Sequence, residues 1–150
     1  MSFSTTQQIE LKVQKGIRQA EDDLVIWIQD ALENTKYQKP DPASKKNRDK
    51  LEESQFRNLV RVSDTTESSE VVKNFLRYQV GRDEKWGRGP TSLAERIVSD
   101  IDSKLKAKAE AITKEAKGGN ANEIHIELIR RYLGYGARYL KYLNSKTEQS

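Results

Sequence analysis

Few residues of this sequence have side chains suited to catalysis. His125 is the only histidine, and the absence of cysteine excludes thiolate metal sites and thiol nucleophiles. Two carboxylate clusters, Asp100-x-Asp102 and Glu21-Asp22-Asp23, are the other candidates. A pair of catalytic carboxylates needs surroundings that separate their two pKa values, which neighbouring acids on a solvated helix lack. We therefore expect His125 on a helix surface or core edge, and no catalytic site, metal site or cofactor.

Residues 81–90 form a basic, glycine-rich segment, Gly-Arg-Asp-Glu-Lys-Trp-Gly-Arg-Gly-Pro, that superficially resembles a phosphate-binding loop. A P-loop has a lysine and a serine or threonine directly after its last glycine, at the start of a helix that follows a strand. None of these features is present here. Contact with a phosphate through backbone N–H groups stays open for this segment.

The most informative pattern is the position of arginine and tyrosine relative to apolar residues. Residues 130–142 read Arg-Arg-Tyr-Leu-Gly-Tyr-Gly-Ala-Arg-Tyr-Leu-Lys-Tyr. At about 100° per residue, Arg131, Tyr135 and Arg138 share a helix face with Tyr142, opposite the apolar stripe. Arginine binds phosphate in a bidentate manner and stacks on bases, and tyrosine offers a stacking surface that tolerates any base. We predict that this face contacts nucleic acid and is not internal packing.

Basic pairs four residues apart extend the same pattern to two earlier segments, and the glycine-rich segment adds further cations. The candidate nucleic-acid-binding residues are Arg57, Arg61, Lys73, Arg77, Arg82, Lys85, Arg88, Arg130, Arg131, Tyr135, Arg138 and Lys141. Two other interpretations stay open. Alternating charges often mark a solvated helix face, and tyrosines on a bundle's flank often pack on a neighbouring helix. Gly134 and Gly136 also indicate close helix contact.

A helix-turn-helix motif across the turn at residues 63–66 is a further interpretation. In that motif the first residues of the second helix enter the major groove. Here they are Glu67, Ser68, Ser69 and Glu70, and the two acids repel phosphates. Sequence-specific reading of a duplex is therefore not expected.

The elements that must position these residues are all predicted to be helices. Five stretches repeat apolar residues every three or four positions, and none alternates as a strand does. They run from about Thr6 to Asn34, from about Asp49 to Val62, from the turn at 63–66 to Gly81, from the cap at Ser92 to Gly118-Gly119, and from the cap at Asn120 to about residue 144. We expect further caps at Thr5 with Gln8 and at Asp64 with Glu67.

The predicted fold class is all-α, a five-helix bundle with a long first helix. One domain covers residues 1–150, ordered from about residue 6 to 144, with residues 145–150 as a frayed tail. Apolar residues make up 35% of the chain and charged residues 33%, and the net charge is +4. A positive field favours an anionic partner. The sequence has no signal-peptide pattern and no long apolar run, so we expect a soluble, cytoplasmic protein without membrane contact.

Two parts of the chain carry a run of basic and aromatic residues that resembles a known family. They are residues 56–62 with 70–82, and residues 127–134 with 138–142, so that the likeness covers about residues 54–143. Together they resemble the helical small subunit of CRISPR effector complexes of the Cascade and type III kinds. The resemblance implies a non-catalytic subunit of a ribonucleoprotein, present in several copies beside the large subunit and the backbone subunits. It also implies contact with the guide RNA–target duplex or the displaced DNA strand, while base pairing reads the sequence.

A second class of function stays open beside this one. The same arginine and tyrosine faces would also suit a helical scaffold or adaptor that binds acidic protein surfaces in another complex. For the first class, we predict that the isolated chain binds nucleic acid weakly, with strong salt dependence and no sequence preference.

Overall fold

The computed structural model describes residues 4–39 and 50–148. Over these residues the chain is helical and has no strand beyond an isolated bridge between Lys36 and Ser92. The elements are α1 (Thr5–Asn34), α2 (Glu53–Thr65), α3 (Ser69–Arg82), α4 (Leu93–Asp100), the π-helical turn η2 (Ile101–Leu105), α5 (Lys106–Ala116) and α6 (Ala121–Glu148). Since α4, η2 and α5 follow one another without a break, they form one helical rod. The prediction of an all-α bundle of five helices with a long first helix is confirmed.

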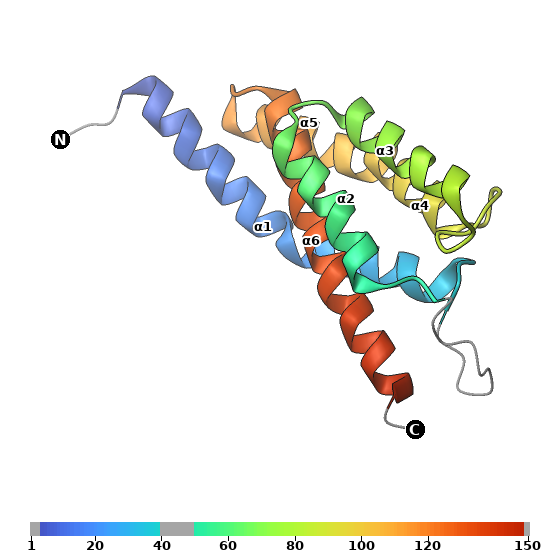
Figure 1. Ribbon diagram of the computed structural model, residues 1–150. Helices are drawn as coiled ribbons and strands as arrows, with labels where there is room; N and C mark the ends of the chain where they lie inside the picture. The colour runs from blue at the N-terminus through green and yellow to red at the C-terminus, as the bar shows by residue number, and fades with distance from the viewer. Residues whose placement is uncertain (1–3, 40–49, 149–150) are drawn as a thin grey trace.

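The last helix, α6, runs through the middle of the bundle. It contacts α1 on one side and α2 on the other, and α5 also packs on it (Figure 1). α3 packs against α2 and α4, and the α4 rod also packs on α1. The middle of α6 is therefore flanked by two other helices.

Apolar spacing explains why α1 packs along its length. Its buried residues are Val13, Ile17, Ala20, Leu24, Ile28, Ala31 and Leu32. The helix begins with a capping box formed by Ser4 and Gln7, in which the Ser4 side chain accepts from Gln7 N and the Gln7 side chain accepts from Ser4 N. The prediction of this box at Thr5 and Gln8 was therefore wrong by one residue.

At Gly136, α6 lies close to both α1 and α2. A Cβ atom at Gly136 would lie 2.6 Å from Phe56 Cζ on α2 and 2.7 Å from Ile28 Cγ1 on α1. The predicted close helix contact is thus confirmed at Gly136. At Gly134 it is wrong, because a Cβ atom there would have no neighbour within 4 Å.

The boundaries around α2 differ from the prediction. The predicted start at Asp49 lies outside the described residues, and α2 begins at Glu53 and continues to Thr65, beyond Val62. Asp64 therefore belongs to the last turn of α2 and does not cap α3. Ser68 caps α3, since its Oγ accepts from Val71 N at 3.3 Å.

The glycine-rich segment after α3 packs against the end of α1. Trp86 is fully buried, and its ring centroid lies 5.2 Å from that of Phe56. Gly87 has φ +79° and faces Lys36 O, which would lie 2.2 Å from a Cβ atom there. Only glycine permits both the conformation and the close approach. Gly87 N donates to Glu84 O at 3.0 Å, so this amide is engaged in the fold and not available to a phosphate.

The single histidine, His125, is hydrogen-bonded to the π-helical turn η2. His125 is buried on α6, and its Nε2 donates to the Ile101 carbonyl at 2.7 Å. The prediction of a core-edge histidine is therefore confirmed.

The start of α6 follows the prediction and its end does not. Asn120 Oδ1 accepts from Asn122 N at 2.9 Å and from Glu123 N at 3.1 Å, as expected of a cap. α6 continues to Glu148, beyond the predicted end near residue 144, and residues 149–150 of the predicted tail lie outside the described chain.

Candidate nucleic-acid interface

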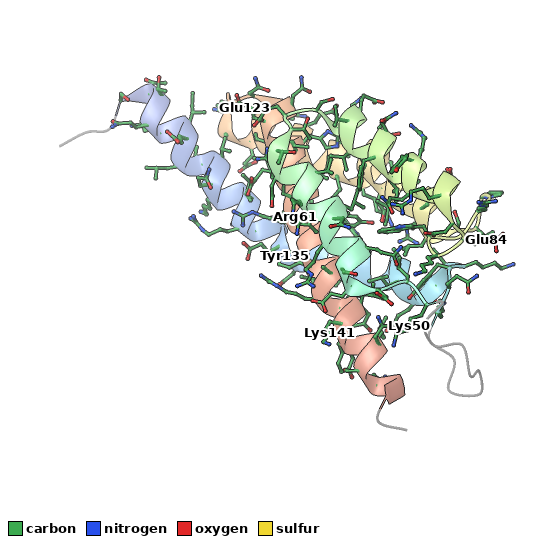
Figure 2. All side chains as sticks on the ribbon, in the orientation of Figure 1. Lys50, Arg61, Glu84, Glu123, Tyr135 and Lys141 are labelled. Atoms are coloured by element: carbon green, nitrogen blue, oxygen red, sulfur yellow. The ribbon has the colours of Figure 1, made fainter. Side chains whose placement is uncertain are left out.

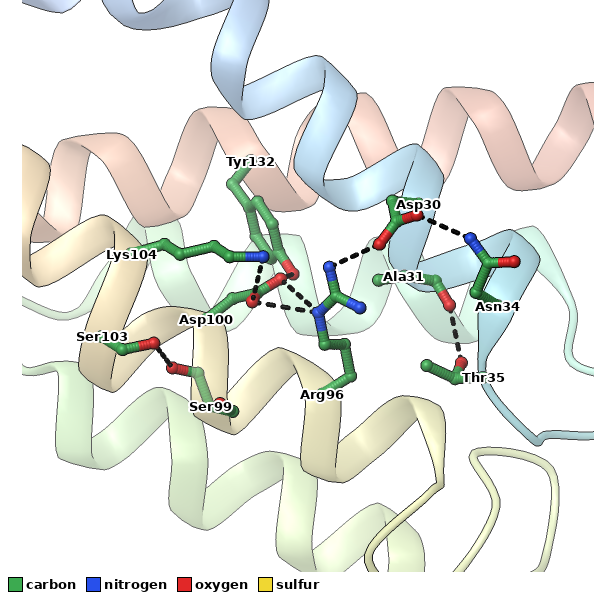
Figure 3. A network of polar contacts seen from close by, with 10 residues as sticks. All are labelled: Asp30, Ala31, Asn34, Thr35, Arg96, Ser99, Asp100, Ser103, Lys104 and Tyr132. Atoms are coloured by element: carbon green, nitrogen blue, oxygen red, sulfur yellow. Dashed lines mark hydrogen bonds and ion pairs between the residues drawn. The ribbon is translucent and has the colours of Figure 1, made fainter.

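Asp100 was expected on a solvated helix, but the structure buries it. Both of its carboxylate oxygens accept from Arg96 Nε, at 3.1 and 3.2 Å, and Oδ2 accepts from the Tyr132 hydroxyl at 2.7 Å (Figure 3). Lys104 Nζ lies 3.7 Å away, and Arg96 Nη2 continues to Asp30 Oδ2 at 2.7 Å. Burial and the Asp100 carboxylate together raise the pKa of Tyr132 well above its usual value, so the phenol remains a donor. We call these five residues the Asp100 network.

The polar groups of the Asp100 network form hydrogen bonds and ion pairs with one another. Breaking a paired buried charge is costly, so this cluster holds α1, α4 and α6 together and does not offer Asp100 as a ligand. Within the described residues, no three His, Cys, Asp or Glu side chains come together as they would to hold a metal ion.

Lys73 also lies where the sequence did not place it. Its side chain is 7% exposed, and Nζ lies 2.7 Å from both Glu70 Oε1 and Asp102 Oδ1. Hydrogen bonds to Asp102 and then to Glu70 raise the pKa of Lys73. The predicted pattern, in which basic residues lie on the helix face opposite the apolar residues, is therefore wrong for Lys73, because its side chain is buried against Asp102 on η2.

α3 and the following segment carry four more of the predicted residues. Arg77 is exposed, and Lys85 is half-buried. The Arg82 guanidinium lies 5.8 Å from the Tyr78 ring centroid, and Arg88 Nη2 donates to Val80 O at 3.3 Å. The structure therefore divides the predicted residues between this region and the α6 region, and does not bring all of them together.

A groove of about 460 Å³ runs between α2 and α6. Its lining residues are Asp64, Glu127, Arg130, Arg131, Gly134, Tyr135 and Arg138. Arg57 and Arg61 are exposed on α2, seven and three residues before Asp64, so they continue the same edge of that helix. Figure 2 shows Arg61, Tyr135 and Lys141 along the region where α2 meets α6.

Arg130 is engaged at one end of this groove. Its Nε donates to Ser63 O and its Nη2 to Thr66 O, both at 2.8 Å. Its guanidinium also lies 3.3 Å from Glu67 and 3.4 Å from Glu127. The last carbonyls of a helix have no hydrogen-bond partner inside the helix. Arg130 therefore caps the C-terminal end of α2.

Arg131 is engaged between helices. Its Nη1 lies 2.6 Å from Glu21 Oε1 on α1, and its Nε lies 3.0 Å from Glu127 Oε1 on α6. The predicted face of Arg131, Tyr135, Arg138 and Tyr142 exists on α6, but at Arg131 part of it holds α1 and α6 together.

The other end of the groove is open. Arg138 is exposed, its guanidinium lies 6.0 Å from the Tyr135 ring centroid, and no carboxylate of the described residues pairs with it. Lys141 is exposed one turn further along. Arg61 donates to Asn58 Oδ1 at 3.2 Å, and Arg57 has only a 4.0 Å pair with Glu53. We define the open face as Arg57, Arg61, Tyr135, Arg138 and Lys141.

Tyrosines extend this region toward α1. A second groove, of about 260 Å³, is lined by Val25, Gln29, Tyr135, Arg138, Tyr139 and Tyr142. Tyr142 is 53% exposed, and its ring centroid lies 5.8 Å from that of Tyr139. The Tyr139 hydroxyl donates to Glu33 Oε1, and this bond raises the pKa of Tyr139 to about 12. Tyr139 therefore anchors α6 to α1, whereas Tyr142 presents its ring to solvent.

Three residues that line the first groove, Asp64, Glu127 and Gly134, were not among the predicted site residues. Asp64 was predicted to be a helix cap. Its spacing of three residues from Arg61 places both side chains on the same edge of a helix, which is the signal that could have identified it. Gly134 was read as a packing glycine, and nothing in its local sequence separates it from Gly136.

Searches of protein-family models, curated proteins and solved structures found no significant match to this chain. Among the described residues, none of the helices combines the length and the apolar character required to cross a bilayer.

Proposed function

We propose that this chain is a non-catalytic subunit that binds the backbone of nucleic acid without reading its sequence. One observation carries the proposal. Arg138 lines an open groove beside the half-buried Tyr135, Arg61 is exposed on the neighbouring edge of α2, and neither arginine has a carboxylate partner among the described residues. Guanidinium groups suit phosphates, and a tyrosine ring suits any base.

The chemistry of the open face favours binding that is indifferent to sequence. Cations contact phosphates, which are the same at every position, and phosphate contacts orient a complex without specifying bases. The net charge of +4 is modest, so affinity of the isolated chain is expected to be low and salt-dependent.

The resemblance to CRISPR small subunits suggests the setting of this activity. In that setting the protein is cytoplasmic and lies beside the large subunit, the backbone subunits and further copies of itself. Its open face contacts the guide RNA–target duplex or the displaced DNA strand, and the other subunits supply the rest of the binding energy. The absence of sequence readout then fits a complex in which base pairing selects the target.

A scaffold or adaptor protein is the second candidate function, and α3 favours it. Val71 is 47% exposed and Tyr78 is 57% exposed on that helix, and Arg82 stacks on Tyr78. Exposed aromatic and arginine side chains are enriched at protein interfaces. This face suits a protein partner, which a subunit of a larger assembly would also need.

Charge-matched variants test the proposed function. Arg61→Gln with Arg138→Gln should weaken binding of a labelled single strand and lower the slope of log K against log salt by about 1.4, for two lost phosphate contacts. Lys106→Gln with Lys114→Gln on exposed positions of α5 removes the same charge elsewhere and is the control. Equal effects of both double variants would mean that only net charge matters and would contradict the proposal. Pull-down from the native host, followed by mass spectrometry and by ultraviolet absorbance for bound RNA, separates the CRISPR setting from the adaptor.

A further inference from the structure

Gly134 forms an open floor in the groove between α2 and α6. It lies in the interior of a long helix, where glycine is less favourable than any ordinary residue except proline. Gly136, two residues later, is required by the close contact of Phe56 and Ile28. Gly134 has no such requirement, since a Cβ atom there would have no neighbour within 4 Å. The fold itself therefore does not explain this glycine.

The surroundings of Gly134 restrict what can reach it. Along this groove α6 is flanked by α2, which contributes Asp64 to the lining, and by α1, whose Glu21 pairs with Arg131. The major groove of a duplex is about 12 Å wide and admits a single helix of about 10–12 Å diameter. A helix flanked on both sides by other helices cannot enter it. A duplex would contact the exposed arginines on the rim, whereas a single strand is thin enough to reach the floor.

We propose that the groove accepts one nucleic acid strand whose backbone lies against α6 at Gly134, beside Arg138 and on the side of α2 that carries Arg61. This inference rests on the proposed function and specifies its ligand as a single strand. The Arg138 guanidinium lies over the ring of Tyr135, next to the floor, so the guanidinium contacts a phosphate of the strand while the exposed part of the ring contacts a base. Asp64 and Glu127 line the opposite end of the groove and repel phosphates, so the strand lies toward the Arg138 end.

Gly134→Gln tests the proposal by filling the floor without changing charge. Glutamine is a good helix former, so the variant should fold at least as well as the natural chain. Gly81→Gln on α3 is the matched control, since a Cβ atom at Gly81 also has no neighbour within 4 Å and the residue lies outside the groove. The probes are fluorescent oligothymidylate and oligouridylate of about 16 nucleotides and a blunt DNA duplex, measured by anisotropy at low salt.

The expected result is a loss of about tenfold in single-strand affinity for Gly134→Gln, with duplex affinity and the Gly81→Gln control unchanged. Equal affinity of Gly134→Gln and the natural chain for single strands would overturn the floor contact. An equal loss for both single strands and duplex would also overturn it, because a rim contact would then suffice. In either case the effect of Arg61→Gln with Arg138→Gln would still decide the proposed function separately.

Discussion

The Asp100 network and the open face both contain arginine and tyrosine. The arginine of the network is paired with a buried carboxylate, whereas the arginines of the open face have no such partner in the described part of the chain. In the network, Arg96 and Tyr132 both donate to Asp100, which is 1% exposed. On the open face, the guanidinium of the exposed Arg138 lies 6.0 Å from the Tyr135 ring centroid and has no carboxylate partner among the described residues. The residue types do not distinguish the two regions. What distinguishes them is whether a carboxylate of the same chain uses the arginine's donors.

The same contrast divides the arginines of α6 along its length. Arg130 and Arg131, near the C-terminal end of α2, donate to carbonyls and carboxylates of α1, α2 and the following turn. Arg138, two turns later, has no such partner among the described residues. We infer that the first two arginines contribute to folding and that the third is available for binding.

The largest expected effect is in the Asp100 network. Asp100→Asn leaves the partly buried Arg96 with an incomplete partner, and breaking a buried pair by changing one member costs about 3 kcal/mol. Urea denaturation should show this loss in the free energy of unfolding. Asp22→Asn, an exposed acid on α1, is the control and should change it by less than about 0.5 kcal/mol. A small effect at Asp100 would mean that the network is not structural and would remove the basis of the comparison.

Arg130 and Arg138 give a direct comparison on one helix. Arg130→Met removes charged hydrogen bonds to Ser63 O and Thr66 O, each bond to a charged group contributing about 1.5–3 kcal/mol. We expect a loss of about 2 kcal/mol, since water replaces part of the lost bonding at the end of α2. Arg138→Met should stay within about 0.5 kcal/mol of the natural chain and should weaken nucleic-acid binding. If both variants lose similar stability, Arg138 also belongs to the fold.

Acid should weaken the Asp100 network through Asp30. The hydrogen bond from Arg96, and then that from Asn34, lowers the pKa of Asp30 below its ordinary value of 3.8. Because the folded pKa lies below the unfolded one, this contribution to stability is present above pH 3.8 and is lost as the pH falls through the folded pKa. The difference in stability between the natural chain and Asp30→Asn should therefore shrink over that range. A difference independent of pH would show that the Arg96 contact does not depend on the charge of Asp30.

Most of the fold was predictable because local signals agree with the packing. The spacing of Val13, Ile17 and Leu24 on α1 predicts a buried stripe, and the Asn120 side chain predicts the start of α6. The burial of Trp86 was not predictable, because it depends on Gly87 approaching the Lys36 carbonyl, a contact between residues far apart in sequence. Local periodicity contains no information on such a contact.

The candidate site was predictable only as a helix face. The helical period places Arg131, Tyr135 and Arg138 together, as found. It could not show that Glu21 on α1 pairs with Arg131 while no acid pairs with Arg138, since that depends on which helices become neighbours. Lys73 was misplaced for the same reason, because Asp102 lies 29 residues away in the chain.

The smallest expected effect is at Asp64. It tests whether the carboxylate at this end of the groove repels a bound phosphate backbone. Asp64 lines the groove and lies in the last turn of α2, where an acid is unfavourable because of the helix dipole. Asp64→Asn should therefore raise stability by a few tenths of a kcal/mol and should strengthen single-strand binding by about twofold at low salt. The gain should disappear at about 1 M salt, where the screening length falls to about 3 Å. Glu110→Gln on an exposed position of α5 changes the net charge equally and should strengthen binding less. Weaker binding after Asp64→Asn would mean that the carboxylate accepts a hydrogen bond from the ligand, and the groove would then suit a basic protein segment better than a phosphate backbone.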